Sequence, residues 1–66
     1  MQIVINGRRR EVSDAASVEQ VVATISTSLQ GIAVAVNGEI VRRASWPAVT
    51  LKAGDDVEVL TAVQGG

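Results

Sequence analysis

The chain begins with a short run of mainly β-branched residues that ends in an Asn-Gly pair. Residues 2–5 form the first run, and Asn6-Gly7 follows it as the strongest two-residue hairpin signal, because both turn positions tolerate positive φ. The sequence therefore predicts an antiparallel hairpin whose second strand covers residues 8–12.

The same pattern returns in the middle of the chain. Residues 32–36 alternate large apolar residues with alanines, and Asn37-Gly38 comes directly after them. This pattern predicts a second hairpin, whose return strand covers residues 39–41. Gly31 precedes it and is expected to close a helical segment.

Between the two hairpins, the apolar residues change to a helical period. Ser17 and Gln20 have the spacing of a capping box, which satisfies backbone donors at a helix start. We expect one helix over about residues 18–28, held by tertiary packing because its valines lower intrinsic helicity. Its core-facing stripe consists of Val18, Val21, Val22, Ile25 and Leu29.

The last third of the chain predicts less regular structure and then one strand. Trp46-Pro47 interrupts the pattern, residues 49–51 suggest a brief edge strand, and residues 52–55 suggest a turn. The last strand is expected over residues 56–63. Residues 64–66, Gln-Gly-Gly, carry no side chain that could pack a core, so we expect a flexible tail.

This order of elements is α+β: a mixed sheet of four to five strands with one helix across one face. With 66 residues, the chain is expected to form a single domain over residues 1–66, with room for a core but not for a deep pocket. We found neither a basic leader nor an apolar run near the roughly 18 residues of a membrane span. We therefore expect a full-length cytoplasmic protein that is monomeric when free.

The amino-acid composition limits the chemical roles that the chain can have. The chain has no Cys and no His, which excludes disulfides, the commonest zinc ligands and the usual proton shuttles. A net charge of −1 argues against nucleic-acid binding. We therefore expect a protein that is not an enzyme.

A set of motifs extends over nearly the whole chain: the stretch 34–41, Arg43, Trp46, Gly54-Asp55 and the ending 57–66. Together they resemble the ThiS family, the sulfur carriers of thiamine biosynthesis. This resemblance implies a ubiquitin-like β-grasp fold. One departure is Arg42, where many relatives are expected to have proline.

The chemistry of the C-terminus agrees with this resemblance. A chain without Cys has no thiol for a transferable sulfur, so the plausible handle is the carboxylate of Gly66. An α-carboxyl with a pKa of about 3.3 to 3.7 is ionised at neutral pH and can attack the α-phosphate of ATP. Gly65 and Gln64 belong to a thin tail that could enter a narrow channel in another enzyme.

The resemblance also implies the partners. A ThiF-type enzyme would use ATP to adenylate Gly66, and a cysteine desulfurase route would supply the sulfur. Thiazole synthase (ThiG) would take the sulfur from the resulting thiocarboxylate. The chain itself would bind no cofactor or metal, and we expect neither nucleic-acid nor membrane partners.

Strand alternation predicts where partners dock. Ile3, Ile5, Val57 and Val59 are expected to face the helix. Val4, Leu60 and Ala62 would then face outward and form an exposed apolar patch. Such patches on small domains often mark partner surfaces, so we expect docking there, with Leu60 at the centre.

Other conspicuous residues have simpler interpretations. Arg8, Arg9 and Arg10 are interpreted as a solvated edge strand, since charge on an edge blocks aggregation. Asp55, Asp56 and Glu58 are interpreted as turn and strand residues, not metal ligands. Trp46 is expected to anchor a loop.

Two alternatives of other function classes share the Gly-Gly ending. One is a MoaD-type small subunit of molybdopterin synthase, which we would expect to be longer. The other is a ubiquitin-like modifier that ends on a lysine as an isopeptide.

Overall fold

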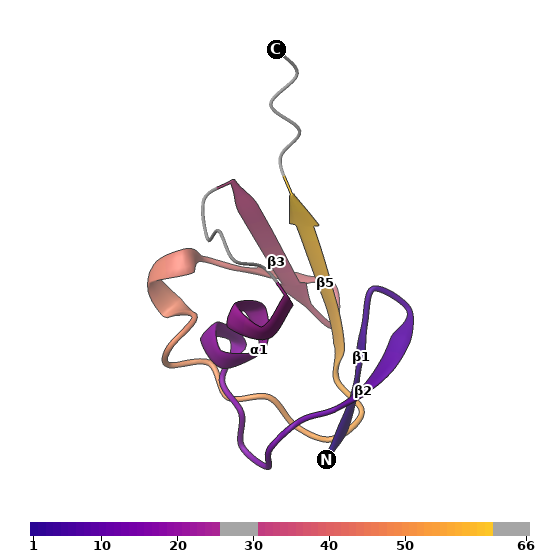
Figure 1. Cartoon of the computed structure of the whole chain (residues 1–66). Coiled ribbons are helices and arrows are strands. Elements are labelled where there is room, and N and C mark those ends of the chain that lie inside the picture. Colours follow the sequence, from indigo (N-terminus) through magenta and orange to yellow (C-terminus); the bar gives the residue numbers. More distant parts are fainter. Residues whose placement is uncertain (26–30, 62–66) are drawn as a thin grey trace.

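The computed structural model describes residues 1–25 and 31–61. In the described residues, one helix lies across one face of a five-stranded sheet (Figure 1). The elements in chain order are β1 (Gln2–Ile5), β2 (Arg8–Glu11), α1 (Val18–Ile25), β3 (Ile32–Val36), β4 (Glu39–Val41), the 3₁₀ helix η1 (Arg43–Ser45) and β5 (Asp56–Thr61).

The strand order of the sheet is β2-β1-β5-β3-β4. β5 pairs in parallel with β1 and antiparallel with β3, and both hairpins are antiparallel. The last strand in sequence therefore lies at the centre of the sheet, between the two hairpins (Figure 1). The prediction of a mixed sheet with one helix across it is confirmed.

Both predicted hairpin turns have the backbone that Asn-Gly favours. Asn6 and Gly7 have φ values of 50° and 82°, and Asn37 and Gly38 have 51° and 84°. Two consecutive positive φ values are the requirement of a type I′ turn, whose twist matches that of the flanking strands. The chain therefore sets the register of both hairpins locally.

The helix starts as the sequence predicts. The Gln20 N–H donates to the Ser17 hydroxyl oxygen (3.1 Å), and the Ser17 N–H donates to the Gln20 side-chain oxygen (2.9 Å). This reciprocal pair is a capping box. The predicted continuation of the helix through residues 26–28, with Leu29 of its stripe, lies outside the described residues.

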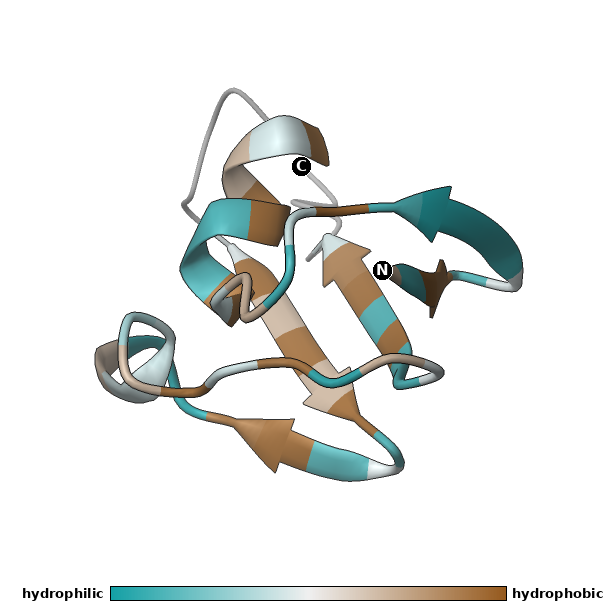
Figure 2. Ribbon diagram, turned by 90° about the horizontal axis from the view of Figure 1, so that it is seen from below, coloured by the Kyte–Doolittle hydropathy of each residue, from teal (hydrophilic) through white to brown (hydrophobic). Residues whose placement is uncertain are grey.

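The core lies between α1 and the sheet. In Figure 2, hydrophobic and hydrophilic residues alternate along the ribbon of α1 and of the strand β5. Val18, Val21 and Val22 of α1 are buried, as their helical spacing predicts. The other buried apolar residues are Ile3, Ile5, Ala16, Val34, Trp46, Leu51 and Val57. In the part of the chain that the structure describes, no helix is long and apolar enough to cross a membrane.

The segment after β4 corrects one prediction. Residues 49–51 do not form an edge strand; only an isolated bridge joins Thr50 to Ser17. Two backbone bonds of this segment go to the start of α1: the Val18 N–H donates to the Val49 carbonyl, and the Leu51 N–H donates to the Ala16 carbonyl. Burial of Leu51 in the core keeps the segment against the start of α1 and away from the sheet edges.

Trp46 anchors this loop, as predicted. Its ring is buried, and its Nε1 donates a hydrogen bond to the Val41 carbonyl at 3.0 Å. The Arg43 guanidinium lies 5.8 Å from the ring centroid, within cation–π range. The only aromatic residue of the chain therefore fixes η1 to the end of β4.

Candidate functional site: the end of β5 and the outer face of the sheet

The predicted site residues fall into two groups. Leu60 and Val4 belong to β5 and β1. Ala62, Gln64, Gly65 and Gly66 lie outside the described residues, as does the predicted extension of the last strand to residue 63. The structure therefore describes the part of the sheet that precedes the C-terminal residues.

The two turn asparagines hold β5 from both sides. The Val59 N–H donates to Asn6 Oδ1 (2.8 Å), and Asn6 Nδ2 donates to the Val59 carbonyl (3.1 Å). On the other side, the Asp56 N–H donates to Asn37 Oδ1 at 2.9 Å. Each hairpin turn thus fastens the strand that leads to the C-terminus, through a side chain that could not be assigned this role from sequence.

β5 separates a buried face from an exposed face. Val57 has no exposed surface, whereas Leu60 keeps 61% of its surface exposed. Val59 is half-buried and packs against the core, as its predicted inward orientation requires. The predicted alternation is therefore confirmed for these three residues. Val4 on β1 is half-buried and so contributes less exposed surface than expected.

A second exposed apolar residue extends the surface around Leu60. Ile40 on β4 is 82% exposed. The strand register places Ile40 opposite Ala35, and Ala33 opposite Leu60, on the same side of the sheet. We call Leu60, Ala33, Ala35 and Ile40 the outer-face patch. Glu58 also lies opposite Ala35 and adds one exposed charge on this side.

Sequence reasoning missed Ile40, although the signal was present. A two-residue turn at Asn37-Gly38 pairs Val36 with Glu39 and therefore Ala35 with Ile40. Counting the register outward from the turn would have placed Ile40 beside the alanines of β3.

Of the acidic residues near β5, Asp55 has a structural role. The Asp55 carboxylate accepts a hydrogen bond from the Lys52 N–H (2.8 Å) and one from Asn37 Nδ2 (3.0 Å). Its interpretation as a turn residue is confirmed. Asp56 and Glu58 are exposed on β5. Within residues 1–25 and 31–61, no group of three or more acidic, His or Cys side chains could hold a metal ion.

Comparison with known proteins identifies the relatives of this chain. The model of the ThiS family matches residues 3–66. The crystal structure of the thiamine biosynthesis protein ThiS from Geobacter metallireducens superposes with a TM-score of 0.85 at 29% identity, with both chains covered completely. A solution structure of a thiamine biosynthesis protein from the same organism gives 0.81 at 29% identity, covering all of this chain and 88% of that one.

A longer protein also contains a region similar to this chain. The thiazole synthase of Paramagnetospirillum magneticum is 33% identical over all 66 residues. The chain spans only about one fifth of the length of that protein, at 20%.

These findings agree with the mixed sheet and the single helix across it, both of which the sequence predicted, and with the strand order that the structure adds. The family match covers all but the first two residues. The chain therefore has a β-grasp fold and belongs to the ThiS family, the sulfur carrier proteins of thiamine biosynthesis, which are not enzymes.

Proposed function

We propose that this protein carries sulfur on the carboxylate of Gly66, as a thiocarboxylate. The observation that carries the proposal is the match to a sulfur-carrier family through residue 66 in a chain without Cys. With no thiol available, sulfur must be held on another group. A terminal carboxylate can hold it once one of its oxygens is replaced.

The replacement needs activation, because a carboxylate is a poor electrophile. One carboxylate oxygen of Gly66 attacks the α-phosphorus of ATP, pyrophosphate leaves, and an acyl adenylate forms. A persulfide sulfur then attacks the acyl carbon, and AMP leaves with its electron pair and the oxygen. Reductive cleavage of the resulting acyl disulfide by a thiol releases the thiocarboxylate.

The catalytic groups for these steps would belong to partner enzymes. A ThiF-type enzyme would bind ATP and form the adenylate, and a cysteine desulfurase route would supply the persulfide. Because adenylation consumes ATP, the proposal places these steps in the cytoplasm. The protein itself is a cosubstrate and binds no cofactor.

Thiazole synthase (ThiG) is the proposed sulfur acceptor. A region similar to this chain is part of a polypeptide that is named thiazole synthase, and this supports physical proximity of the two activities. The assignment to the ThiS family also favours this acceptor over a molybdopterin synthase subunit or over the lysine side chains that a protein modifier would use.

The outer-face patch is the proposed docking surface for both enzymes. It carries Leu60 and Ile40, the exposed large apolar residues among those that the structure describes. Leu60 is one residue before the end of β5, so a partner seated on it would receive the C-terminal residues that follow. Val4 and Ala62 are proposed as further contacts of the partner. Val4 has a smaller role, because it is half-buried and lies opposite Asp56, four residues before Leu60 on β5.

Changes at the last residue test the proposal. The protein is incubated with ATP, a cognate ThiF-type enzyme, a cysteine desulfurase, cysteine and a thiol reductant, and its intact mass is measured. The unchanged chain should gain the mass difference between sulfur and oxygen. Chains without Gly66, or with one residue added after it, should gain nothing, and a sulfur-bearing product from either would refute the proposal.

A further inference from the structure

A groove lies between the edge strand β2 and the helix α1, apart from the outer-face patch. It has a volume of about 690 Å³ and opens to solvent. Its floor is apolar, formed by Ile5, Ala16 and Val21. Its polar walls include Arg10, Glu11, Gln20 and Thr24. An apolar floor with a few polar groups at the walls is the usual composition of a binding groove.

One wall of this groove is an unpaired strand edge. β2 ends the sheet and pairs only with β1. Met1 and Val12 exchange two backbone hydrogen bonds, with the Val12 N–H donating to the Met1 carbonyl (2.8 Å) and the Met1 amine donating to the Val12 carbonyl (2.7 Å). Bonding alternates along an antiparallel pair, so the backbone groups of Arg9 and Glu11 point away from β1.

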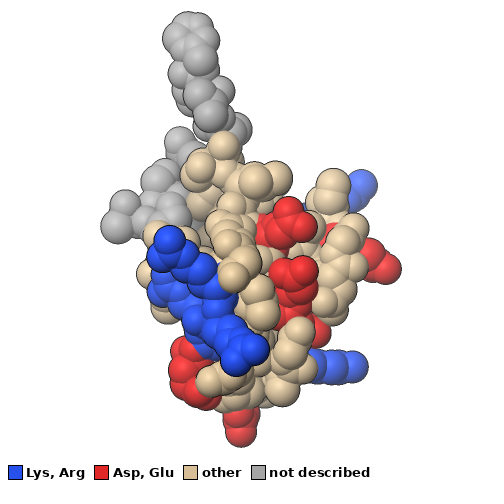
Figure 3. Space-filling model, turned by 90° about the vertical axis from the view of Figure 1, so that its right-hand side faces the viewer, with Lys and Arg blue, Asp and Glu red and all other residues tan. Residues whose placement is uncertain are grey.

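The side chains at this edge carry positive charge. Arg8, Arg9 and Arg10 are all exposed, and Figure 3 shows Lys and Arg side chains gathered into a ridge on this side of the molecule. Arg10 pairs with the buried Ile3 and therefore projects on the helix side, toward the groove.

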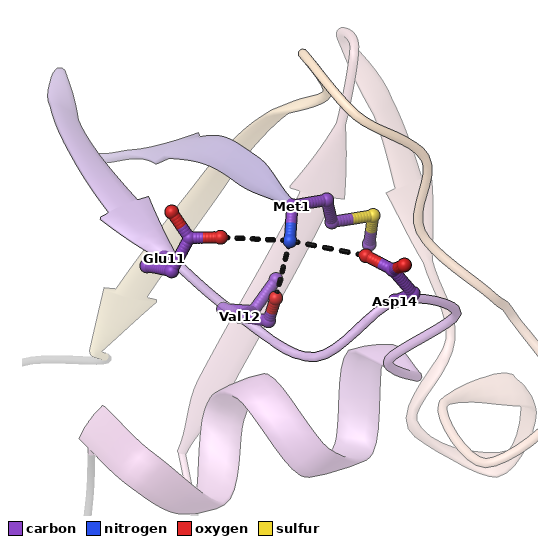
Figure 4. Close-up of polar contacts among 4 residues, drawn as sticks. All are labelled: Met1, Glu11, Val12 and Asp14. Carbon is purple, nitrogen blue, oxygen red and sulfur yellow. Dashed lines mark hydrogen bonds and ion pairs between the residues drawn. The ribbon is translucent and has the colours of Figure 1, made fainter.

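The nearby carboxylates do not neutralise these arginines. Glu11 and Asp14 lie 2.8 and 3.1 Å from the Met1 ammonium nitrogen (Figure 4). Among residues 1–25 and 31–61, no ion pair involves any of the three guanidinium groups. The edge of β2 therefore has three arginine side chains, and the backbone N–H and C=O groups of Arg9 and Glu11 point away from the sheet.

We propose that an extended acidic segment of a partner protein binds here, as an additional strand along β2. The backbone of Arg9 and Glu11 would hydrogen-bond to the added strand, in the manner of β-strand addition. Every second side chain of that strand would enter the apolar groove. The carboxylates on its opposite face would pair with Arg9, which projects away from the helix because it lies opposite Val4. Charge on an edge prevents indiscriminate pairing, and here it also selects the partner.

A second copy of this chain is a poor occupant. Pairing β2 with β2 of another copy would bring two runs of three arginines together. Directly opposed like charges destabilise a strand pair, so an acidic partner is favoured over self-association.

The first test uses a short capped peptide in which glutamate and valine alternate, added to the full-length protein and followed through backbone amide NMR signals. Shifts are expected at Arg9, Glu11, Val21 and Thr24. A peptide with lysine in place of glutamate is the matched control and should not bind. No shift at millimolar peptide, equal binding of the lysine peptide, or shifts confined to the outer-face patch would each overturn the proposal.

Two pairs of variants separate charge from strand pairing. Arg9→Glu should weaken binding about tenfold or more through loss of a charge-assisted contact. Lys52→Glu makes the same charge change outside the groove. It should change the logarithm of the dissociation constant by less than half as much.

Arg9→Pro removes the outward N–H, whereas Arg9→Gln removes only the charge. Proline is tolerated where an edge N–H faces solvent, so both variants should keep dispersed amide spectra. Arg9→Pro should bind several-fold more weakly than Arg9→Gln. Equal affinities of these two variants would show that the edge attracts anions without adding a strand, and would overturn the proposal.

Discussion

The two faces of the sheet are built from the same strands but differ in their exposure to solvent. On the face toward α1, Ile3, Ile5, Val34 and Val57 are buried in the core. On the other face, Ile40 and Leu60 remain exposed beside alanines of β3. Neighbouring residues of one strand thus belong either to the fold or to the outer-face patch.

This difference teaches that stability and partner recognition can be changed separately in this chain. Burial of apolar surface stabilises the fold mainly on the helix side. Exposed apolar side chains on the opposite face contribute little to folding and would be buried by a partner that docks there. Variants on the helix side should therefore lower the free energy of unfolding, whereas variants on the outer face should weaken partner binding.

The largest effect on stability is expected from Ile3→Ala, which opens a cavity under α1. Removing a buried isoleucine side chain costs about 2 to 5 kcal/mol. A domain of this size has a total stability of about 3 to 10 kcal/mol, so the variant should be partly unfolded at room temperature. Leu60→Ala on the exposed face is the control, with a change of about 0.5 kcal/mol or less in urea denaturation. Equal losses in both variants would contradict the division between the faces.

A change in the C-terminal residues should affect transfer and leave folding intact. Gly65→Val places a branched side chain beside the proposed reacting carboxylate, and a misplacement of about 1 Å can cost on the order of a hundredfold in rate. The free energy of unfolding should stay within about 0.5 kcal/mol of the original. Adenylate formation and thermal unfolding are measured on the same preparation. Adenylation at the original rate would show that no narrow channel receives this residue.

Leu60→Asp tests the outer face as a docking surface. A charge at the centre of an apolar interface should cost about 2 kcal/mol of binding, or roughly thirtyfold in kcat/KM for adenylation at low carrier concentration. The exposed position predicts an unchanged fold. Thr61→Asp makes the same charge change at the neighbouring exposed position and is the control. An unaffected rate in Leu60→Asp would remove Leu60 from the proposed surface.

The smallest effect is expected from the charges at the start of β1. Hydrogen bonds from the Met1 ammonium to Glu11, and then to Asp14, raise its pKa above the ordinary value of 8.0. A raised pKa means that the folded state holds the proton more tightly, so this contribution is complete below about pH 8 and disappears at higher pH. A slight decrease in the melting temperature is therefore expected as the pH rises above about 8.

The control for this titration is Glu11→Gln combined with Asp14→Asn. The double variant lacks both carboxylates and should show a flatter dependence of melting temperature on pH. A steep dependence that persists in this variant would assign the effect to another group.

Short-range sequence signals predicted most of the fold, because the hairpin turns and the helix start are each determined by residues that are close in the sequence. The Asn-Gly turns require positive φ at both positions, and Ser17 with Gln20 caps the helix whatever lies around it. Residues 49–51 were wrongly predicted as a strand because their β-branched pattern does not show that Leu51 must reach the core. The side-chain bonds of Asn6 to Val59 join residues 53 positions apart, and no local pattern contains them.

The candidate site was predicted in part. Alternation placed Leu60 outward and Val57 inward, and both are confirmed. Ile40 was missed because the short strand β4 was not counted into register with Ala35. The groove beside β2 could not be predicted, since it depends on how far α1 stands from the edge strand.

The most direct test of the central claim is fragment-ion mass spectrometry of the protein after incubation with ATP, a ThiF-type enzyme, a cysteine desulfurase, cysteine and a thiol reductant. We predict that the mass difference between sulfur and oxygen is present in every fragment that contains Gly66 and in no fragment that lacks it. Sulfur on a fragment without Gly66, or an unmodified chain whose adenylate had formed, would contradict the claim that Gly66 carries the sulfur.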